Sequence, residues 1–248
     1  MPPFFEPMKD FFKRCKEQAR SVLFPAHYTC EICRKEVFDG ASFCPACERA
    51  LPRNDGFFCK KCGRRILEDF PVCLECKREL PVYTAARSAF VYGGEIVGLV
   101  RRFKTGAKYL ARTFARETEP VFRAEYDFSD FIVSVPMGGE SLRRRGYNQS
   151  ALLADELSVR LGIEHRAAAL VKTRDTAAQK FLTLGEREKN LTGSFRVHER
   201  KACEGKTILL VDDVLTTGAT ANAVSRVLFA AHAARVLVLT VASVPQRD

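Results

Sequence analysis

Long apolar runs are missing from this 248-residue sequence: no uninterrupted stretch approaches the roughly 20 residues that a membrane-spanning helix needs. Residues 1–20 are interrupted by proline and charged side chains, so we also expect no signal peptide. The chain is therefore predicted to be cytoplasmic, in a compartment where thiols stay reduced. Its hydrophobic fraction of 46% is typical of a globular protein, and its length suffices for an α/β core plus a small module.

Negative charge is in the minority, because 30 Asp and Glu residues stand against 40 Lys and Arg, which gives a formal net charge of +10. Such an excess suits an anionic partner, either a pyrophosphate-bearing metabolite or nucleic acid. Net charge alone does not choose between these two classes.

The one stretch with the outline of a nucleotide-binding P-loop, residues 98–105, lacks a required glycine. Phe103 stands where that glycine would precede the lysine, and its side chain would keep the backbone from wrapping a phosphate. The spacing of Ile96, Val97, Val100 and Phe103 instead predicts one apolar face of an amphipathic helix. We therefore exclude a P-loop nucleoside triphosphatase.

Cysteine, in contrast, is abundant. Eight of the ten cysteines form four Cys-x-x-Cys pairs, and the spacing of the first two pairs is repeated in the second two. Two residues between thiolates let one tight turn present both sulfurs to a tetrahedral ion, and two such turns complete a structural site with four cysteine ligands. The sequence therefore predicts two Zn²⁺ ions, with these ligands: Cys30, Cys33, Cys44, Cys47, Cys59, Cys62, Cys73 and Cys76.

Disulfides and redox Cys-x-x-Cys chemistry are the alternatives to zinc. A reducing compartment argues against disulfides, and four copies are more than redox chemistry needs. The spacing leaves the zinc pairing open. A sequential arrangement joins the first pair with the second and the third with the fourth, whereas an interleaved one joins the first with the third and the second with the fourth.

A predicted strand near the C-terminus runs into two carboxylates. The apolar run Ile208–Val211 is typical of a strand buried on both faces of a parallel sheet, and Asp212 and Asp213 follow where open α/β sheets bind ligands. A small, hydroxyl-rich turn then opens a helix of about residues 218–231, a position that favours anions; it comprises Thr216, Thr217, Gly218, Ala219 and Thr220. Carboxylates for sugar hydroxyls beside a phosphate cradle predict a site for a phosphorylated sugar, whereas an N-cap with a solvated neighbour is the structural alternative.

Two further predicted strands end in loops that suit phosphates. Residues 131–136 form an apolar run that ends in a candidate anion nest, consisting of Pro136, Met137, Gly138 and Gly139. A strand of about residues 168–172 leads into a polar span with Lys172 and Arg174, which has the composition of a mobile lid. Strands that alternate with helices predict an α/β fold with a mainly parallel sheet.

Taken in order, these motifs resemble the ComF/GntX family of bacterial proteins. The resemblance rests on the cysteine pairs and on Leu23-Phe-Pro, Phe103-Lys104, Val135-Pro136, Arg145-Gly-Tyr-Asn-Gln149, Lys172-Thr-Arg174, Thr176, Gln179, Arg187, Asn190 and Val211–Thr220. It implies a type I phosphoribosyltransferase-like parallel sheet with an N-terminal Cys-rich zinc-binding module. We divide the chain into a helical extension (1–25), a zinc-binding module with two four-cysteine sites (26–80) and a transferase-like domain (81–248).

The resemblance also implies a substrate, phosphoribosyl pyrophosphate (PRPP), with Mg²⁺. Asp212 and Asp213 would hold the ribose hydroxyls, residues 216–220 the 5′-phosphate, and residues 136–139 the pyrophosphate. Lys172 and Arg174 are candidates for the leaving group, and a hood formed partly by residues 81–110 would cover an acceptor that the sequence does not identify.

Two functions are compatible with these features. The first is a PRPP-binding phosphoribosyltransferase that transfers or senses phosphoribosyl groups, in DNA uptake by competent bacteria or in nucleotide metabolism. The alternative is a non-enzymatic adaptor that keeps the fold, contacts competence proteins and binds single-stranded DNA through its zinc fingers and through Phe57 and Phe58.

Overall fold

The structure of the chain is a computed structural model that describes residues 29–38, 40–174, 191 and 193–245. The predicted helical extension lies outside the described residues, as do the motif positions Leu23–Pro25, Thr176, Gln179, Arg187 and Asn190. Contacts divide the chain into two compact units, residues 1–51 and 52–248, and each is described by itself.

The described part of the first unit is a single cysteine-rich finger. A bridge between Thr29 and Glu36 closes a tight turn, and helix α2 (Pro45–Ala50) follows. Only a few apolar side chains are buried here, among them Val37 and Phe43. Because so small a core contributes little, the cysteines must supply most of the folding energy of this unit through a bound metal.

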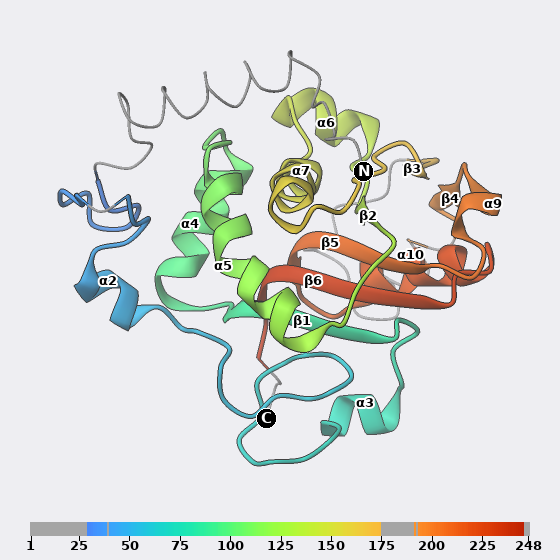
Figure 1. Cartoon of the computed structure of the whole chain (residues 1–248), viewed down its shortest axis with the longest axis horizontal. Coiled ribbons are helices and arrows are strands. Elements are labelled where there is room, and N and C mark those ends of the chain that lie inside the picture. The colour runs from blue at the N-terminus through green and yellow to red at the C-terminus, as the bar shows by residue number, and fades with distance from the viewer. Residues whose placement is uncertain (1–28, 39, 175–190, 192, 246–248) are drawn as a thin grey trace, which may run out of the picture. The chain divides into compact units, whose positions relative to one another are not determined.

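The second unit is built on a four-stranded parallel sheet, in the order β1 (Ala85–Val91), β6 (Arg235–Ser243), β5 (Thr207–Leu215) and β2 (Phe131–Ser134) (Figure 1). The central strands are almost continuously buried, as expected for strands covered on both faces. The predicted parallel α/β fold is confirmed. Strand β5 extends further than predicted and includes the two acids, so they lie within its last residues and not after it.

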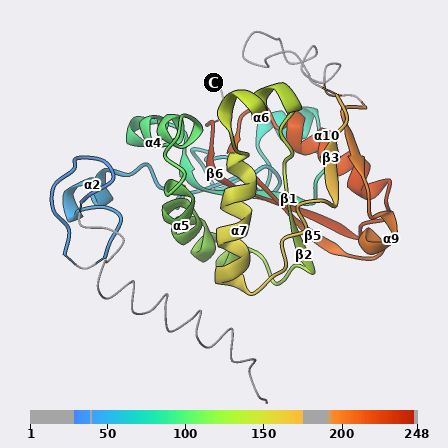
Figure 2. The same cartoon turned by 90° about the horizontal axis from the view of Figure 1, so that it is seen from above.

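Helices cover both faces of the sheet. Helices α4 (Gly94–Lys104), α5 (Leu110–Glu125) and α7 (Gln149–Leu161) lie on one face and α10 (Ala219–Phe229) on the other (Figures 1 and 2). The short helices are α3 (Leu74–Arg78), α6 (Gly139–Arg145) and α9 (Arg200–Cys203). Within the described residues, no helix is long and apolar enough to cross a membrane.

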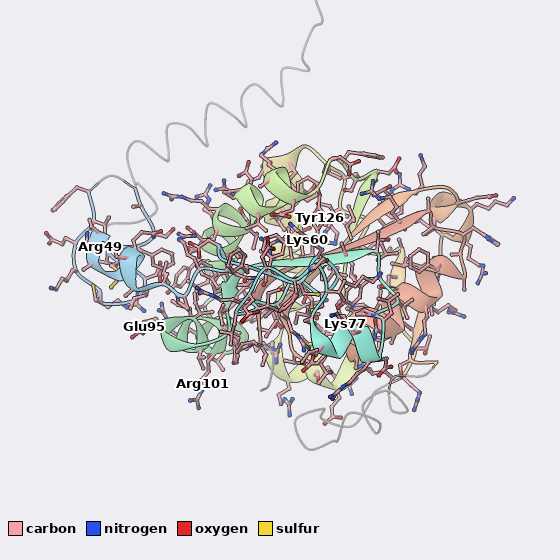
Figure 3. All side chains as sticks on the ribbon, turned by 90° about the horizontal axis from the view of Figure 1, so that it is seen from below. Arg49, Lys60, Lys77, Glu95, Arg101 and Tyr126 are labelled. Carbon is pink, nitrogen blue, oxygen red and sulfur yellow. The ribbon has the colours of Figure 1, made fainter. Side chains whose placement is uncertain are left out.

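Helix α4 confirms that residues 98–105 are not a P-loop but corrects the predicted apolar face. Leu99 is buried with Ile96, Val100 and Phe103, whereas Val97 is 38% exposed. Glu95 and Arg101 lie outside this buried face and are exposed (Figure 3).

The strand predicted near residues 168–172 does not join the parallel sheet. It forms β3 (Leu170–Lys172), which pairs antiparallel with β4 (Phe195–Val197) in a separate two-stranded sheet. The sequence does not predict strand β4, because three residues are too short to show a period-two pattern.

The second cysteine finger belongs to the same compact unit as the sheet, and it covers the outer edge of β1. Backbone hydrogen bonds join the finger and the residues just before it to that strand. The Ala86 N–H donates to the Lys61 carbonyl at 2.9 Å, and the Asn54 N–H, ahead of the finger, donates to the Ala89 carbonyl at 2.9 Å. The contact is tight at Gly63, where an added Cβ would lie 2.1 Å from the Ala86 carbonyl oxygen. A sheet edge that would otherwise be exposed is thereby satisfied.

Candidate functional site

The eight paired cysteines form two separate clusters. In each cluster the sulfur atoms lie within 4.8 Å of one another, one cluster consisting of Cys30, Cys33, Cys44 and Cys47 and the other of Cys59, Cys62, Cys73 and Cys76. The structure therefore selects the sequential pairing. We call residues 59–76, with the second cluster, the second zinc ribbon.

The clusters have the geometry of zinc sites. A tetrahedral ion with bonds of about 2.3 Å to sulfur separates its ligands by about 3.8 Å. The measured separations are 3.6 Å between Cys33 and Cys44 and 3.7 Å between Cys62 and Cys73. In the second zinc ribbon, the Cys62 and Cys73 N–H groups also donate to Cys59 Sγ at 3.5 and 3.3 Å, which is how proteins stabilise a metal-bound thiolate. Both donor sets fit structural Zn²⁺.

Two carboxylates lie next to each other near the carboxyl end of β5. The Ser150 hydroxyl at the start of α7 donates to Asp212 Oδ1 at 2.8 Å, and the Asp213 N–H donates to the same oxygen at 2.9 Å. The Lys104 ammonium at the end of α4 lies 3.1 Å from Asp213 Oδ2. One hydroxyl, one amide and one cation therefore hold the pair.

The electrostatics of the pair differ from those of two solvated acids. Burial, followed by the negative charge of Asp213, raises the pKa of Asp212 to about 7 from its usual 3.8. The hydrogen bond from Ser150 and the charge of Lys104 act in the opposite direction but do not offset these two causes. Asp212 therefore takes up a proton much more readily near neutral pH than an ordinary aspartate, and a bound cation or sugar hydroxyl would shift that balance.

The segment that links α6 to α7 positions the groups around the acids. The Tyr147 hydroxyl donates to the Phe103 carbonyl, one residue before the lysine that pairs with Asp213. Asn148 Nδ2 donates to the Val135 carbonyl at 2.9 Å, and its Oδ1 caps α7 by accepting from the Ser150 N–H at 3.1 Å. This segment therefore connects the end of α4, the end of β2 and the residue that binds Asp212.

Residues 216–220, called here the phosphate loop, join β5 to α10. Gly218 has a φ of 85°, a left-handed conformation that favours glycine, and Ala219 begins the helix. The Ala219 N–H donates to Thr217 Oγ1 at 3.3 Å. The amides of a first helical turn have no partner within the helix, so the loop presents donors and a partial positive charge beside the acids.

The predicted anion nest, residues 136–139, lies at the same end of the strands as the acids. Strand β2 pairs with β5 so that Ser134 faces Val211, and the Val135 N–H donates to the Val211 carbonyl at 3.0 Å. Gly138 is buried and Gly139 begins α6. Both predicted phosphate-binding loops therefore flank the acid pair.

Lys172 and Arg174 belong to a different part of the unit. Lys172 ends β3 in the two-stranded sheet, where its ammonium lies 5.9 Å from the centre of the Phe195 ring. The polar span that follows Arg174, residues 175–190, lies outside the described residues. The role of these two cations stays a prediction.

Sequence reasoning misses Lys104 and Ser150 as site residues. The sequence draws attention to Lys104 only through the Phe103-Lys104 motif of the family resemblance. No local pattern indicates that a residue on α4 reaches Asp213. Ser150 directly follows the Arg145–Gln149 motif, which is the one available signal for it.

Comparisons with known families identify both modules. A model described as a double zinc ribbon domain matches residues 19–77, which include all eight paired cysteines. A model described as a phosphoribosyl transferase domain matches residues 129–248, which include the acids and both loops.

Among curated proteins, the DNA utilization protein YhgH of Escherichia coli K12 is 32% identical over 216 residues, which cover 84% of this chain and 94% of that protein. Competence protein F of Haemophilus influenzae is 32% identical over 137 residues, covering 52% of this chain and 60% of that protein. Among solved structures, the glutamine PRPP amidotransferase of B. subtilis is 21% identical and covers 54% of this chain and 25% of that chain. Its TM-score of 0.35 is too low to support an argument.

Proposed function

This chain belongs to the ComF/GntX family, and on that premise we propose that it binds PRPP at the acid pair and the two loops beside it. The observation that supports this most is the convergence, at one end of the strands, of Asp212 and Asp213, the phosphate loop and residues 136–139. Each part matches one part of PRPP: the ribose hydroxyls, the 5′-phosphate and the pyrophosphate.

In this proposal the carboxylates accept hydrogen bonds from the ribose 2′- and 3′-hydroxyls. Mg²⁺, an ion that prefers oxygen ligands, would arrive with PRPP and neutralise the pyrophosphate. Asp212 gives up its proton when these groups bind, because a carboxylate that accepts two hydroxyls must be ionised. Lys104 balances the charge of the second carboxylate in the unliganded site.

The reaction proposed for the site is phosphoribosyl transfer. A nucleophilic atom of the acceptor forms a bond to ribose C1 as the C1–O bond to pyrophosphate breaks, and pyrophosphate leaves with the electron pair. The proton of the acceptor passes to solvent. The chain contributes position and charge: the acids orient the ribose, and the N–H groups of residues 136–139, with Lys172 and Arg174, would stabilise the leaving group.

Calorimetric titration of PRPP with Mg²⁺ into zinc-loaded protein tests the proposal. The double variant Asp212→Asn/Asp213→Asn should bind at least about 100-fold more weakly, because two charged acceptors are lost. Asp127→Asn is the matched control, since this acid precedes β2 at the opposite, amino-terminal end of the strands. Equal binding by wild type and double variant, or no binding by wild type, would rule out a PRPP site at these acids.

A second candidate function is the binding of single-stranded DNA, which the names of the relatives favour. YhgH is named a DNA utilization protein, and the Haemophilus relative is named a competence protein. Of the two predicted stacking rings, Phe58 is covered by the Arg87 guanidinium, 3.3 Å from its centre, whereas Phe57 is 52% exposed. A Phe57→Ala variant should therefore weaken salt-dependent binding of oligothymidine, and Phe58→Ala should act only through stability.

A cytoplasmic location is part of the same proposal. Eight thiols that hold zinc must remain reduced, which the cytoplasm ensures. Zinc content after purification under reducing conditions, measured by mass spectrometry, should be two ions per chain.

A further inference from the structure

A cavity of about 430 Å³ lies within residues 52–248, between the second zinc ribbon and the phosphate loop. Arg64 and Glu75 of the ribbon form one wall, Thr216 and Asn222 form another, and Val244 lies at the end of β6. The volume is within the range of small-molecule sites, about 300–1,000 Å³. Pro81 and Tyr83, which belong to the range 81–110 predicted to form part of a hood over the acceptor, also line it.

The ribbon is connected to the phosphate loop by a direct contact. The Arg64 guanidinium donates to the Glu75 carboxylate through one nitrogen and to the Thr216 carbonyl through another. Because Thr216 also borders the small hollow beside Asp212, the cavity and the acid pair share a wall residue.

One polar atom buried in the cavity wall has no hydrogen-bond partner among the described residues. Arg64 is 6% exposed, and its Nε is buried and unpaired within that part of the chain. The Tyr83 side chain lines the same cavity, with its hydroxyl close to Gly218. Since buried polar atoms are nearly always hydrogen-bonded, Arg64 Nε is a group that a ligand would satisfy, and the Tyr83 hydroxyl is a second group available to that ligand.

The charges of the cavity disfavour an anionic ligand. Two cations, Arg64 and Arg78, are balanced by two anions, Glu75 and Glu79. Cys62 and Cys76 also line the cavity, and as zinc-bound thiolates they add negative charge. This lining offers hydrogen-bond donors and acceptors together, and the apolar surfaces of proline, valine and tyrosine side chains suit a flat ring. An anionic ring would gain nothing from it.

We propose that this cavity binds the acceptor of the phosphoribosyl group, a neutral nitrogen heterocycle of one or two rings, and that the second zinc ribbon supplies its recognition groups. The proposal rests on the PRPP function above. A ring nitrogen would bond to ribose C1 while pyrophosphate leaves with the C1–O electron pair, and the proton on that nitrogen would pass to water. The second zinc ribbon is then part of the substrate site.

The test uses full-length, zinc-loaded protein and ligand-observed saturation-transfer NMR. The probes are uracil, hypoxanthine, adenine and nicotinamide, with orotate and nicotinate as anionic counterparts of two of them. Val244→Phe places a larger side chain in the cavity from the end of β6, and Tyr83→Phe removes only a hydroxyl. Tyr109→Phe, whose half-exposed ring lies outside the cavity, is the matched control. PRPP binding is measured separately for each variant.

We expect at least one neutral ring to bind, its anionic counterpart to bind at least tenfold more weakly, and Val244→Phe to lose binding by more than tenfold. Tyr83→Phe should lose about threefold to tenfold, as for one neutral hydrogen bond, and all three variants should bind PRPP within twofold of wild type. If PRPP binds but no neutral ring does, or if Val244→Phe binds the ring normally, this inference is overturned and the PRPP site stands. If a ring binds but PRPP does not, the proposed function fails, and the acceptor role fails with it.

Discussion

The raised pKa of Asp212 makes PRPP binding dependent on pH in a range where ordinary aspartates do not titrate. Burial and the neighbouring Asp213 raise that pKa to about 7, so the unliganded protein takes up a proton there much more readily near neutral pH than at an ordinary aspartate. Binding of ribose hydroxyls and Mg²⁺ requires the ionised form. Affinity should therefore be constant above about pH 8 and fall about tenfold per pH unit below about pH 7.

The same shift sets the number of protons released on binding. The release from Asp212 should be small at pH 8 and should increase as the pH falls through about 7 to 6. Because the folded-state pKa lies above the unfolded value, Asp212 also lowers stability progressively as pH rises from about 4 to 7. Asp212→Asn should remove this cost and stabilise the unliganded protein at pH 8 by on the order of 2–4 kcal/mol.

Calorimetry in buffers of different ionisation enthalpy measures proton release, and titration of PRPP with Mg²⁺ alone corrects for protons of the 5′-phosphate. Thermal melts at pH 5 and pH 8 provide the stability comparison. A release that does not change between pH 6 and pH 8, together with an Asp212→Asn variant no more stable than wild type at pH 8, would refute the reasoning.

Three further predictions concern Lys104, the second zinc ribbon and the contact of that ribbon with β1. Lys104→Met should raise the pKa of Asp212 further, so the pH below which PRPP affinity falls should increase. Lys201 is an exposed lysine on α9, and Lys201→Met should leave that pH unchanged. Cys76→Ser should weaken PRPP binding about tenfold in equilibrium titrations, because it disturbs the ribbon that contacts Thr216. Cys47→Ser, in the first unit, should leave PRPP binding unchanged. Equal effects of the two substitutions would contradict the connection between the ribbon and the phosphate loop. Gly63→Ala should cost at least about 2 kcal/mol in chemical denaturation, since its Cβ would lie 2.1 Å from a carbonyl oxygen. Gly205→Ala, with the same φ of +68° but open space around it, should cost about 1 kcal/mol, and similar values for both would show that the close approach is not real.

The elements with strong local signals were predictable from the sequence. Apolar runs before Asp212 and up to Pro136 predicted the existence and the start of strands β5 and β2, although β5 ends later and β2 earlier than predicted. The Cys-x-x-Cys spacing predicted the zinc ligands. Each of these signals lies within a few residues and reflects a single physical requirement, burial of a strand or coordination of one ion.

The features that could not be predicted from the sequence depend on contacts between distant segments. The zinc pairing depends on how four turns meet in space, and the pairing of Lys104 with Asp213 depends on the angle at which α4 packs. The contact between Arg64 and Thr216 joins residues 152 positions apart. No local period or spacing encodes such contacts, so only the structure shows that the second zinc ribbon borders the phosphate loop.

A crystal structure of the zinc-loaded protein with PRPP and Mg²⁺ would test the central claim most directly. The account predicts ribose hydroxyls within hydrogen-bond distance of Asp212 and Asp213, with the 5′-phosphate on the amides of residues 216–220. PRPP bound elsewhere, or bound with its ribose away from both carboxylates, would contradict it.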